Sequence, residues 1–176
     1  MNIANKVTMV RLFLVPVFMI VYLILGNDYN IAAILFTVAS LTDALDGHLA
    51  RSRNLVTTFG KFADPLVDKL LTMAAFVLLA GNGIIPSWAV VIIIARELII
   101  TGFRTIAASQ NITIAASIYG KAKTFTQCIA IVMLLLNSQF FAKFGVVVFY
   151  IAVVLTILSG IDYLVKNKKV LDLENI

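Results

Sequence analysis

Charged residues are scarce in this sequence, and cysteine is nearly absent. Asp, Glu, Lys and Arg make up only 13% of the 176 residues, whereas 61% are hydrophobic and the mean hydropathy is +1.02. A soluble domain of this length needs far more polar surface, so the composition excludes a soluble globular protein. The single cysteine, Cys128, excludes an internal disulfide and a cysteine zinc cluster. The sequence also lacks internal repeats and low-complexity tracts.

What the sequence has instead is a succession of apolar segments separated by turn residues. A membrane-spanning helix needs about 20 mostly apolar residues. The six segments are Val7–Leu25, Ile31–Ala50, Phe62–Leu79, Trp88–Ala107, Phe125–Leu136 (with an extension toward Ala116) and Val146–Val165. We therefore predict an all-α polytopic membrane protein, with six transmembrane helices in a single domain over residues 1–176. A short N-terminal juxtamembrane segment precedes the first helix, and we expect no removable signal peptide because no small-residue cleavage pattern follows it.

The cations indicate how these helices are oriented. They fall at alternate ends of successive segments: Lys6, Arg51, Arg53, Lys61, Lys121, Lys123, Lys166, Lys168 and Lys169. Lys143 is the only cation at the opposite ends. Because Lys and Arg favour the cytoplasmic side, we predict a multi-pass protein of the cell membrane with both termini in the cytoplasm. The net charge of +5 then reflects topology and attraction to membrane lipids, and we expect no nucleic-acid partner.

Acidic residues inside apolar segments are costly and mark functional sites. Asp43 and Asp46 are separated by three positions and Asp64 and Asp68 by four, so each pair shares one face of its helix. Both pairs lie near the loop between the second and third segments. Antiparallel helices joined by that short loop would bring all four carboxylates to the same depth at the cytoplasmic face.

Four converging carboxylates repel one another unless cations neutralise them. Hard divalent cations prefer oxygen ligands, so we predict that these aspartates bind Mg²⁺ or Mn²⁺. The alternative is four separate ion pairs between the aspartates and the neighbouring Arg51, Arg53, Lys61 and Lys69. Small residues on the same helix faces leave room for a nucleotide beside the carboxylates.

The complete pattern resembles the signature of the CDP-alcohol phosphotransferases. It reads Asp43-x-x-Asp46-Gly47-x-x-Ala50-Arg51, eight residues, then Gly60-x-x-x-Asp64-x-x-x-Asp68. The resemblance covers nearly the whole chain, since that family also has six spans. It implies a homodimeric membrane enzyme with a metal-dependent site open to the cytoplasm. It further implies that Asp68 is the general base and that the CDP group is bound at Gly47, Ala50, Arg51 and Gly60.

Three further segments resemble the phosphatidylglycerophosphate synthases of that family. They are Asn5-x-x-Thr8-x-x-Arg11, Arg96-Glu97 followed by Gly102-x-Arg104, and Gly120-Lys121-x-Lys123-Thr124-x-x-Gln127. This resemblance implies phosphatidyl transfer from CDP-diacylglycerol to glycerol 3-phosphate in phospholipid biosynthesis. A phosphorylated acceptor needs fixed cations, and we predict that Arg104, Lys121 and Lys123 bind its phosphate. Snorkelling of these side chains at the membrane surface is the alternative for all three. Arg96 belongs to the second of these segments, and the alternative to a role in the site is that it only neutralises the charge of Glu97.

Two other functions remain open at this point. Within the same family, the acceptor could be an inositol phosphate or serine. In another class, intramembrane carboxylates suit a divalent-cation transporter, although such transporters place their sites at the midplane between inverted repeats. The absence of a repeat and the position of the acids at one face favour the enzyme.

Overall fold

The computed structural model describes residues 3–25, 29–52, 58–109, 117–136 and 138–167. Within those ranges it does not describe the side chains of residues 3–8, 11, 25, 43–52, 58–65, 68 and 109. All the regular elements in the described ranges are α-helices, which confirms the predicted all-α class for this part of the chain.

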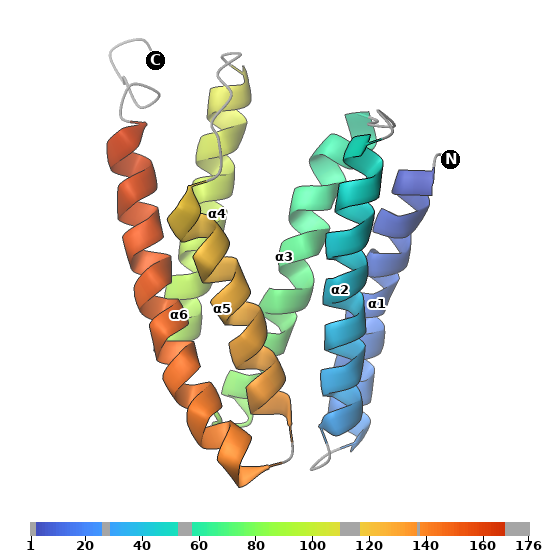
Figure 1. Cartoon of the computed structure of the whole chain (residues 1–176), viewed down its shortest axis with the longest axis vertical. Coiled ribbons are helices and arrows are strands. Elements are labelled where there is room, and N and C mark those ends of the chain that lie inside the picture. Colours follow the sequence, from blue (N-terminus) through green and yellow to red (C-terminus); the bar gives the residue numbers. More distant parts are fainter. Residues whose placement is uncertain (1–2, 26–28, 53–57, 110–116, 137, 168–176) are drawn as a thin grey trace.

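Within these described ranges, six helices run up and down an elongated bundle (Figure 1). They are α1 (Ile3–Leu25), α2 (Asn30–Ser52), α3 (Thr58–Gly81), α4 (Ser87–Ser109), α5 (Ile118–Leu135) and α6 (Gln139–Lys166). Their lengths of 18 to 28 residues correspond to roughly 27–42 Å at a rise of 1.5 Å per residue. That range brackets the thickness of a bilayer core, about 30 Å.

Each predicted apolar segment coincides with one of these helices, but several helices begin earlier. Helices α1 and α3 start four residues before their apolar segments, and α6 starts seven residues before. The segment expected to precede the first helix is thus continuous with α1 from Ile3 onward. Backbone hydrogen bonds continue where side chains become polar, so hydropathy alone underestimates helix length. The predicted N-terminal extension of the fifth segment is confirmed, because α5 begins at Ile118.

The turn residues between the third and fourth apolar segments form a turn, which is tied to two neighbouring elements. Gly83 has φ = 71°, a left-handed conformation that favours glycine. The Asn82 side-chain amide donates hydrogen bonds to the hydroxyl oxygens of Tyr22 (2.9 Å) and Tyr29 (2.6 Å). The two tyrosine rings stack with centroids 4.5 Å apart. The turn thereby joins α3 to α1 and to the residue that precedes α2.

The main hydrophobic core occupies one end of the bundle. Its largest members include Phe18, Phe36, Phe76 and Phe149, all at most 2% exposed. The rings of Phe76 and Phe149 have centroids 5.6 Å apart, and those of Phe18 and Phe36 are 6.1 Å apart. These residues lie in the C-terminal halves of α1 and α3 and the N-terminal halves of α2 and α6, which is the lower end in Figure 1. The upper end carries the residues predicted to form the site.

Helices α5 and α6 form a closely packed antiparallel hairpin. A Cβ atom at Gly145 would lie 3.1 Å from the side chain of Leu134, so a larger residue there would push the two helices or this leucine apart by a few tenths of an ångström. Farther along the hairpin, the buried Gln127 amide donates a hydrogen bond to the Thr156 hydroxyl at 3.1 Å. This interaction joins the two helices without any charged group.

The described residues include two helices, α5 and α6, that are long and apolar enough to cross a membrane. Shorter apolar stretches lie in three others: Leu12–Ile24, Asn30–Thr42 and Lys69–Gly81. Large apolar side chains are also exposed on all six helices, for example Phe13, Ile34, Val77, Val91, Phe125 and Ile157. Soluble monomers rarely expose apolar surface on this scale, whereas a lipid-facing surface does.

Candidate active site

The two predicted aspartate pairs lie on α2 and α3, near the ends of these helices that the 53–57 connection joins. Asp43 and Asp46 belong to the C-terminal half of α2, and Asp64 and Asp68 to the N-terminal half of α3. Figure 1 places these two helix ends at the same, upper end of the bundle. Because both helices are continuous there, each pair shares one helix face. The four side chains lie outside the described residues, so their convergence remains a prediction.

The residues predicted to bind the CDP group belong to the same two helix ends. Gly47, Ala50 and Arg51 follow the first aspartate pair on α2, and Gly60 precedes the second pair on α3. Their side-chain environments also lie outside the described residues. Among the side chains that are described, no three His, Cys, Asp or Glu residues lie close enough to hold a metal ion, but that set excludes the four aspartates.

A buried charge cluster surrounds Glu97 in the middle of α4. Glu97 is 6% exposed, and one of its carboxylate oxygens, Oε1, accepts hydrogen bonds from the ammonium of Lys123 on α5 and from Arg96 (3.3 Å). The Lys69 ammonium of α3 lies 3.6 Å from the other oxygen, Oε2. Three cations from three helices therefore share one carboxylate.

Thr101 adds a hydrogen-bond chain to this cluster. The Lys69 ammonium donates to the Thr101 hydroxyl, which in turn donates to the backbone carbonyl of Glu97 at 2.6 Å. Thr101 lies four residues after Glu97, one helical turn closer to the upper end of α4. Lys69 is thus held by two groups on α4, and it directly follows Asp68, the predicted general base.

Arg104 continues the same face of α4, because it lies seven residues, or about two turns, after Glu97. Its Nε donates a hydrogen bond to the hydroxyl of Tyr163 on α6 at 3.1 Å, and its guanidinium carbon lies 5.5 Å from the centre of that ring. The Arg104 side chain remains exposed in this arrangement. It can therefore reach a phosphate group without losing its support from α6.

The other two predicted acceptor residues lie in different environments. Lys121 is exposed, whereas Lys123 is 3% exposed and bonded to Glu97. Residues two apart are separated by about 200° around a helix, so the two ammonium groups leave α5 in nearly opposite directions. The structure thus brings Lys123 into the Glu97 cluster but does not bring Lys121 there. Simple snorkelling does not describe Lys123, because its charge is buried.

Lys69, Thr101 and Tyr163 were not predicted as site residues from the sequence. Lys69 was expected only as an ion-pair alternative for the aspartates, and the structure places it beside Glu97. Its partner Thr101 is 32 residues away in the chain, and the partner of Tyr163 is 59 residues away. No local pattern relates positions so far apart. The one available signal was Glu97 itself, an acid within an apolar segment.

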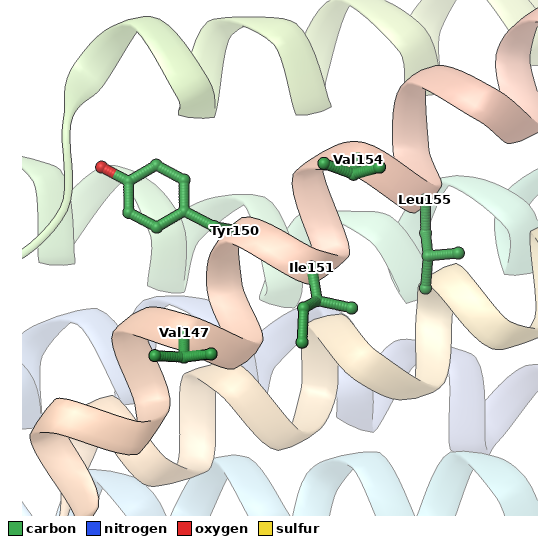
Figure 2. A pocket seen from close by; sticks show the side chains of 5 residues that line it. All are labelled: Val147, Tyr150, Ile151, Val154 and Leu155. Atoms are coloured by element: carbon green, nitrogen blue, oxygen red, sulfur yellow. The ribbon is translucent and has the colours of Figure 1, made fainter.

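A shallow hollow on α6 is apolar, in contrast to the charged cluster around Glu97. Figure 2 shows its five lining side chains, which all come from α6: Val147, Tyr150, Ile151, Val154 and Leu155. Their spacing follows one face of the helix, and none carries a charge. This surface offers no cation for a phosphate group, so we take the charged residues toward the upper end of the bundle as the candidate site.

Comparisons with known proteins find the same family over almost the full length of the chain. The sequence profile of the CDP-alcohol phosphatidyltransferase family matches residues 1–158. A Bacillus subtilis (strain 168) protein named CDP-diacylglycerol–glycerol-3-phosphate 3-phosphatidyltransferase is 40% identical over 191 residues, covering 99% of both chains. A Rickettsia felis protein of the same name is 34% identical over 96% of both chains. A Mycobacterium tuberculosis protein named probable phosphatidylglycerophosphate synthase is 38% identical over 94% of this chain and 81% of its own.

Proposed function

This chain belongs to the CDP-alcohol phosphatidyltransferase family, and we propose that it transfers the phosphatidyl group of CDP-diacylglycerol to glycerol 3-phosphate. The products are phosphatidylglycerol phosphate and CMP, in phospholipid biosynthesis. The observation that carries this choice of substrates is the full-length similarity to relatives named for that reaction. The position of both aspartate pairs at the same end of the bundle supports it.

The donor set of the site fits a divalent metal. Asp43, Asp46, Asp64 and Asp68 supply only carboxylate oxygens, which suit Mg²⁺ or Mn²⁺. Their spacing on two continuous helices gives two carboxylates to each helix face. When bound, such a metal would offset negative charge on the diphosphate of the donor.

The protein's own residues then have separate tasks. Gly47, Ala50 and Gly60 leave space for the CDP group between α2 and α3, and Arg51 pairs with its charge. Asp68 accepts the proton of the C1 hydroxyl of glycerol 3-phosphate. That oxygen bonds to the phosphorus attached to diacylglycerol, in line with the oxygen that leaves on CMP. The phosphatidyl product remains in the bilayer.

The acceptor phosphate meets cations on α4 and α5. Arg104 is exposed and is braced by Tyr163, so its fork of donors is already oriented for a phosphate. Lys121 adds an exposed charge from α5, and Lys123 adds a buried one beside Glu97. An unphosphorylated acceptor such as serine would offer these cations no phosphate to bind.

The reaction requires a membrane setting, because its donor and product are lipids. We propose that all six helices cross the cell membrane, with the upper end in Figure 1 and both termini on the cytoplasmic side. The two apolar helices α5 and α6 and the exposed apolar side chains on the other four support this topology. We also propose that the protein acts as a homodimer, as its family resemblance implies.

The topology can be tested by cysteine labelling in intact cells. In a Cys128→Ala background, a cysteine at Ser87, an exposed position at the lower end of α4, should react with an impermeant thiol reagent. A cysteine at Asn54, in the connection between α2 and α3, should react only after the cells are opened. Labelling of the Asn54→Cys variant in intact cells would show that the six-span orientation is wrong.

The proposed reaction is tested with purified protein, labelled CDP-diacylglycerol and a panel of acceptors. We expect glycerol 3-phosphate to give CMP and phosphatidylglycerol phosphate, and inositol phosphate and serine to give neither. If only another acceptor gives a product, the family assignment stands but glycerol 3-phosphate is not the substrate. If no acceptor reacts while the protein carries divalent cations into proteoliposomes, the transporter alternative is correct.

A further inference from the structure

Glu97 joins three helices at a single carboxylate, although one cation would neutralise it. Arg96 is adjacent in sequence and lies within 3.3 Å, so the charge of Glu97 is already matched on its own helix. Lys123 and Lys69 nevertheless extend from α5 and α3 to the same carboxylate. Within the described side chains, this cluster therefore has two more positive than negative charges.

Such an excess is unfavourable in a buried place unless an anion shares it. Lys123 is 3% exposed, and screening by water and salt is weak there. An ammonium has three N–H donors, and Glu97 accepts one from Lys123, which leaves two for other oxygens. A buried, fixed cation attracts an anion more strongly than an exposed and mobile one.

The geometry also explains how Glu97 is kept in place. Its Oε2 oxygen faces Lys69 of α3, and its Oε1 oxygen faces Arg96 and Lys123. The hydroxyl of Thr101 connects Lys69 to the backbone of Glu97 itself. The carboxylate is therefore fixed by α3 and α4, and it fixes in turn the cation of α5.

We propose that Glu97 is a positioning residue of the acceptor site, which acts through Lys123. It holds the Lys123 ammonium on the face of α4 that carries Arg104, so that both cations meet the phosphate of the acceptor. This role rests on the proposed function, because it requires an acceptor with a phosphate group. It assigns no role to Glu97 in proton transfer or in binding of the donor.

The first test compares Glu97→Gln with Glu97→Asp in the purified enzyme. Glutamine keeps the shape but loses the charge, so the three cations repel one another and Lys123 is released. We expect the KM for glycerol 3-phosphate to rise about tenfold or more, and the KM for CDP-diacylglycerol to stay within about twofold. Glu97→Asp keeps the charge, so its KM for glycerol 3-phosphate should stay close to that of the wild type. A parallel rise of both constants, or a fall of kcat alone, would contradict the proposal.

A double-mutant cycle tests whether Glu97 acts through Lys123. In a Lys123→Met background, Glu97→Gln should raise the KM for glycerol 3-phosphate by no more than about twofold further, because the group it positions is already gone. If the rise in the KM for glycerol 3-phosphate in the double variant equals the product of the rises in the two single variants, Glu97 and Lys123 act independently and the proposal is wrong. The double variant removes the most buried of the three cations together with the carboxylate, so it also serves if Glu97→Gln alone fails to fold.

Thr156→Val is the matched structural control. It removes a buried hydrogen bond between α5 and α6 and leaves the Glu97 cluster unchanged. We expect lower thermal stability with both KM values unchanged. If Glu97→Gln gives the same pattern as Thr156→Val, the positioning role is wrong and the proposed reaction stands. If the wild-type enzyme does not use glycerol 3-phosphate at all, the proposed function and this inference both fail.

Discussion

Asparagine at any one of Asp43, Asp46, Asp64 or Asp68 is expected to lower turnover by about a hundredfold or more. The reason is that, in the proposed site, the four carboxylates form one donor set, so each loss would weaken the whole metal site. A metal contributes several kcal/mol of charge stabilisation to the transition state, and each 1.36 kcal/mol is a factor of ten in rate. The measurement is kcat with saturating substrates, together with titration of Mn²⁺ binding by electron paramagnetic resonance. A chelator should abolish activity, and added Mg²⁺ or Mn²⁺ should restore it.

Asp162→Asn is the control for this prediction. Asp162 lies on α6 and forms an ion pair with Lys166 one turn later, at 2.7 Å. An i,i+4 helix pair with an exposed lysine contributes only a few tenths of a kcal/mol, so activity and metal affinity should stay near those of the wild type. Near-normal turnover in two or more of the four aspartate variants would reject the shared metal site. If a variant keeps normal Mn²⁺ affinity but loses turnover, the substituted aspartate does not bind the metal and takes part in the reaction in another way.

Removing the side chain of Arg104 should raise the KM for glycerol 3-phosphate by about tenfold to a hundredfold. This factor corresponds to the loss of a charge-assisted hydrogen bond, about 1.5–3 kcal/mol. Arg104→Ala and Lys121→Ala should leave the KM for CDP-diacylglycerol and the metal requirement unchanged, because both residues are proposed to bind the acceptor and not the donor or the metal. Arg104→Lys should be intermediate, since a lysine keeps the charge but loses the bidentate fork. Steady-state kinetics with each substrate varied in turn provides the test.

Two variants test whether Arg104 binds the acceptor or only supports the packing of the helices. Tyr163→Phe removes the hydroxyl that accepts the Arg104 hydrogen bond but keeps the ring beneath the guanidinium, so its effect on the acceptor KM should be small. Lys143→Ala removes an exposed cation at the lower end of α6 and should change neither KM. If Arg104→Ala raises both KM values together, Arg104 supports the helices or the donor instead. A reaction with an unphosphorylated alcohol but not with glycerol 3-phosphate would reject the acceptor assignment.

The helices and the family could be predicted from the sequence because both depend on local patterns. Long apolar runs separated by turn residues define six helices wherever the packing places them, and the structure has a helix at each run. The aspartate signature spans only residues 43–68, so its spacing could be read directly, and the comparisons confirm the family. The exact starts of α1, α3 and α6 could not be predicted from hydropathy, since those helices continue into polar residues.

The partners of Glu97 were decided only by the tertiary structure. The sequence offered Arg96 as a neutralising neighbour, and that contact is present. It gave no reason to add Lys123, 26 residues later, or Lys69, 28 residues earlier. The sequence likewise grouped Lys121 with Lys123, whereas the structure exposes the first and buries the second. Spacing along one helix determines which residues share a face, but the packing of several helices against one another determines which face meets a neighbour and which meets solvent or lipid.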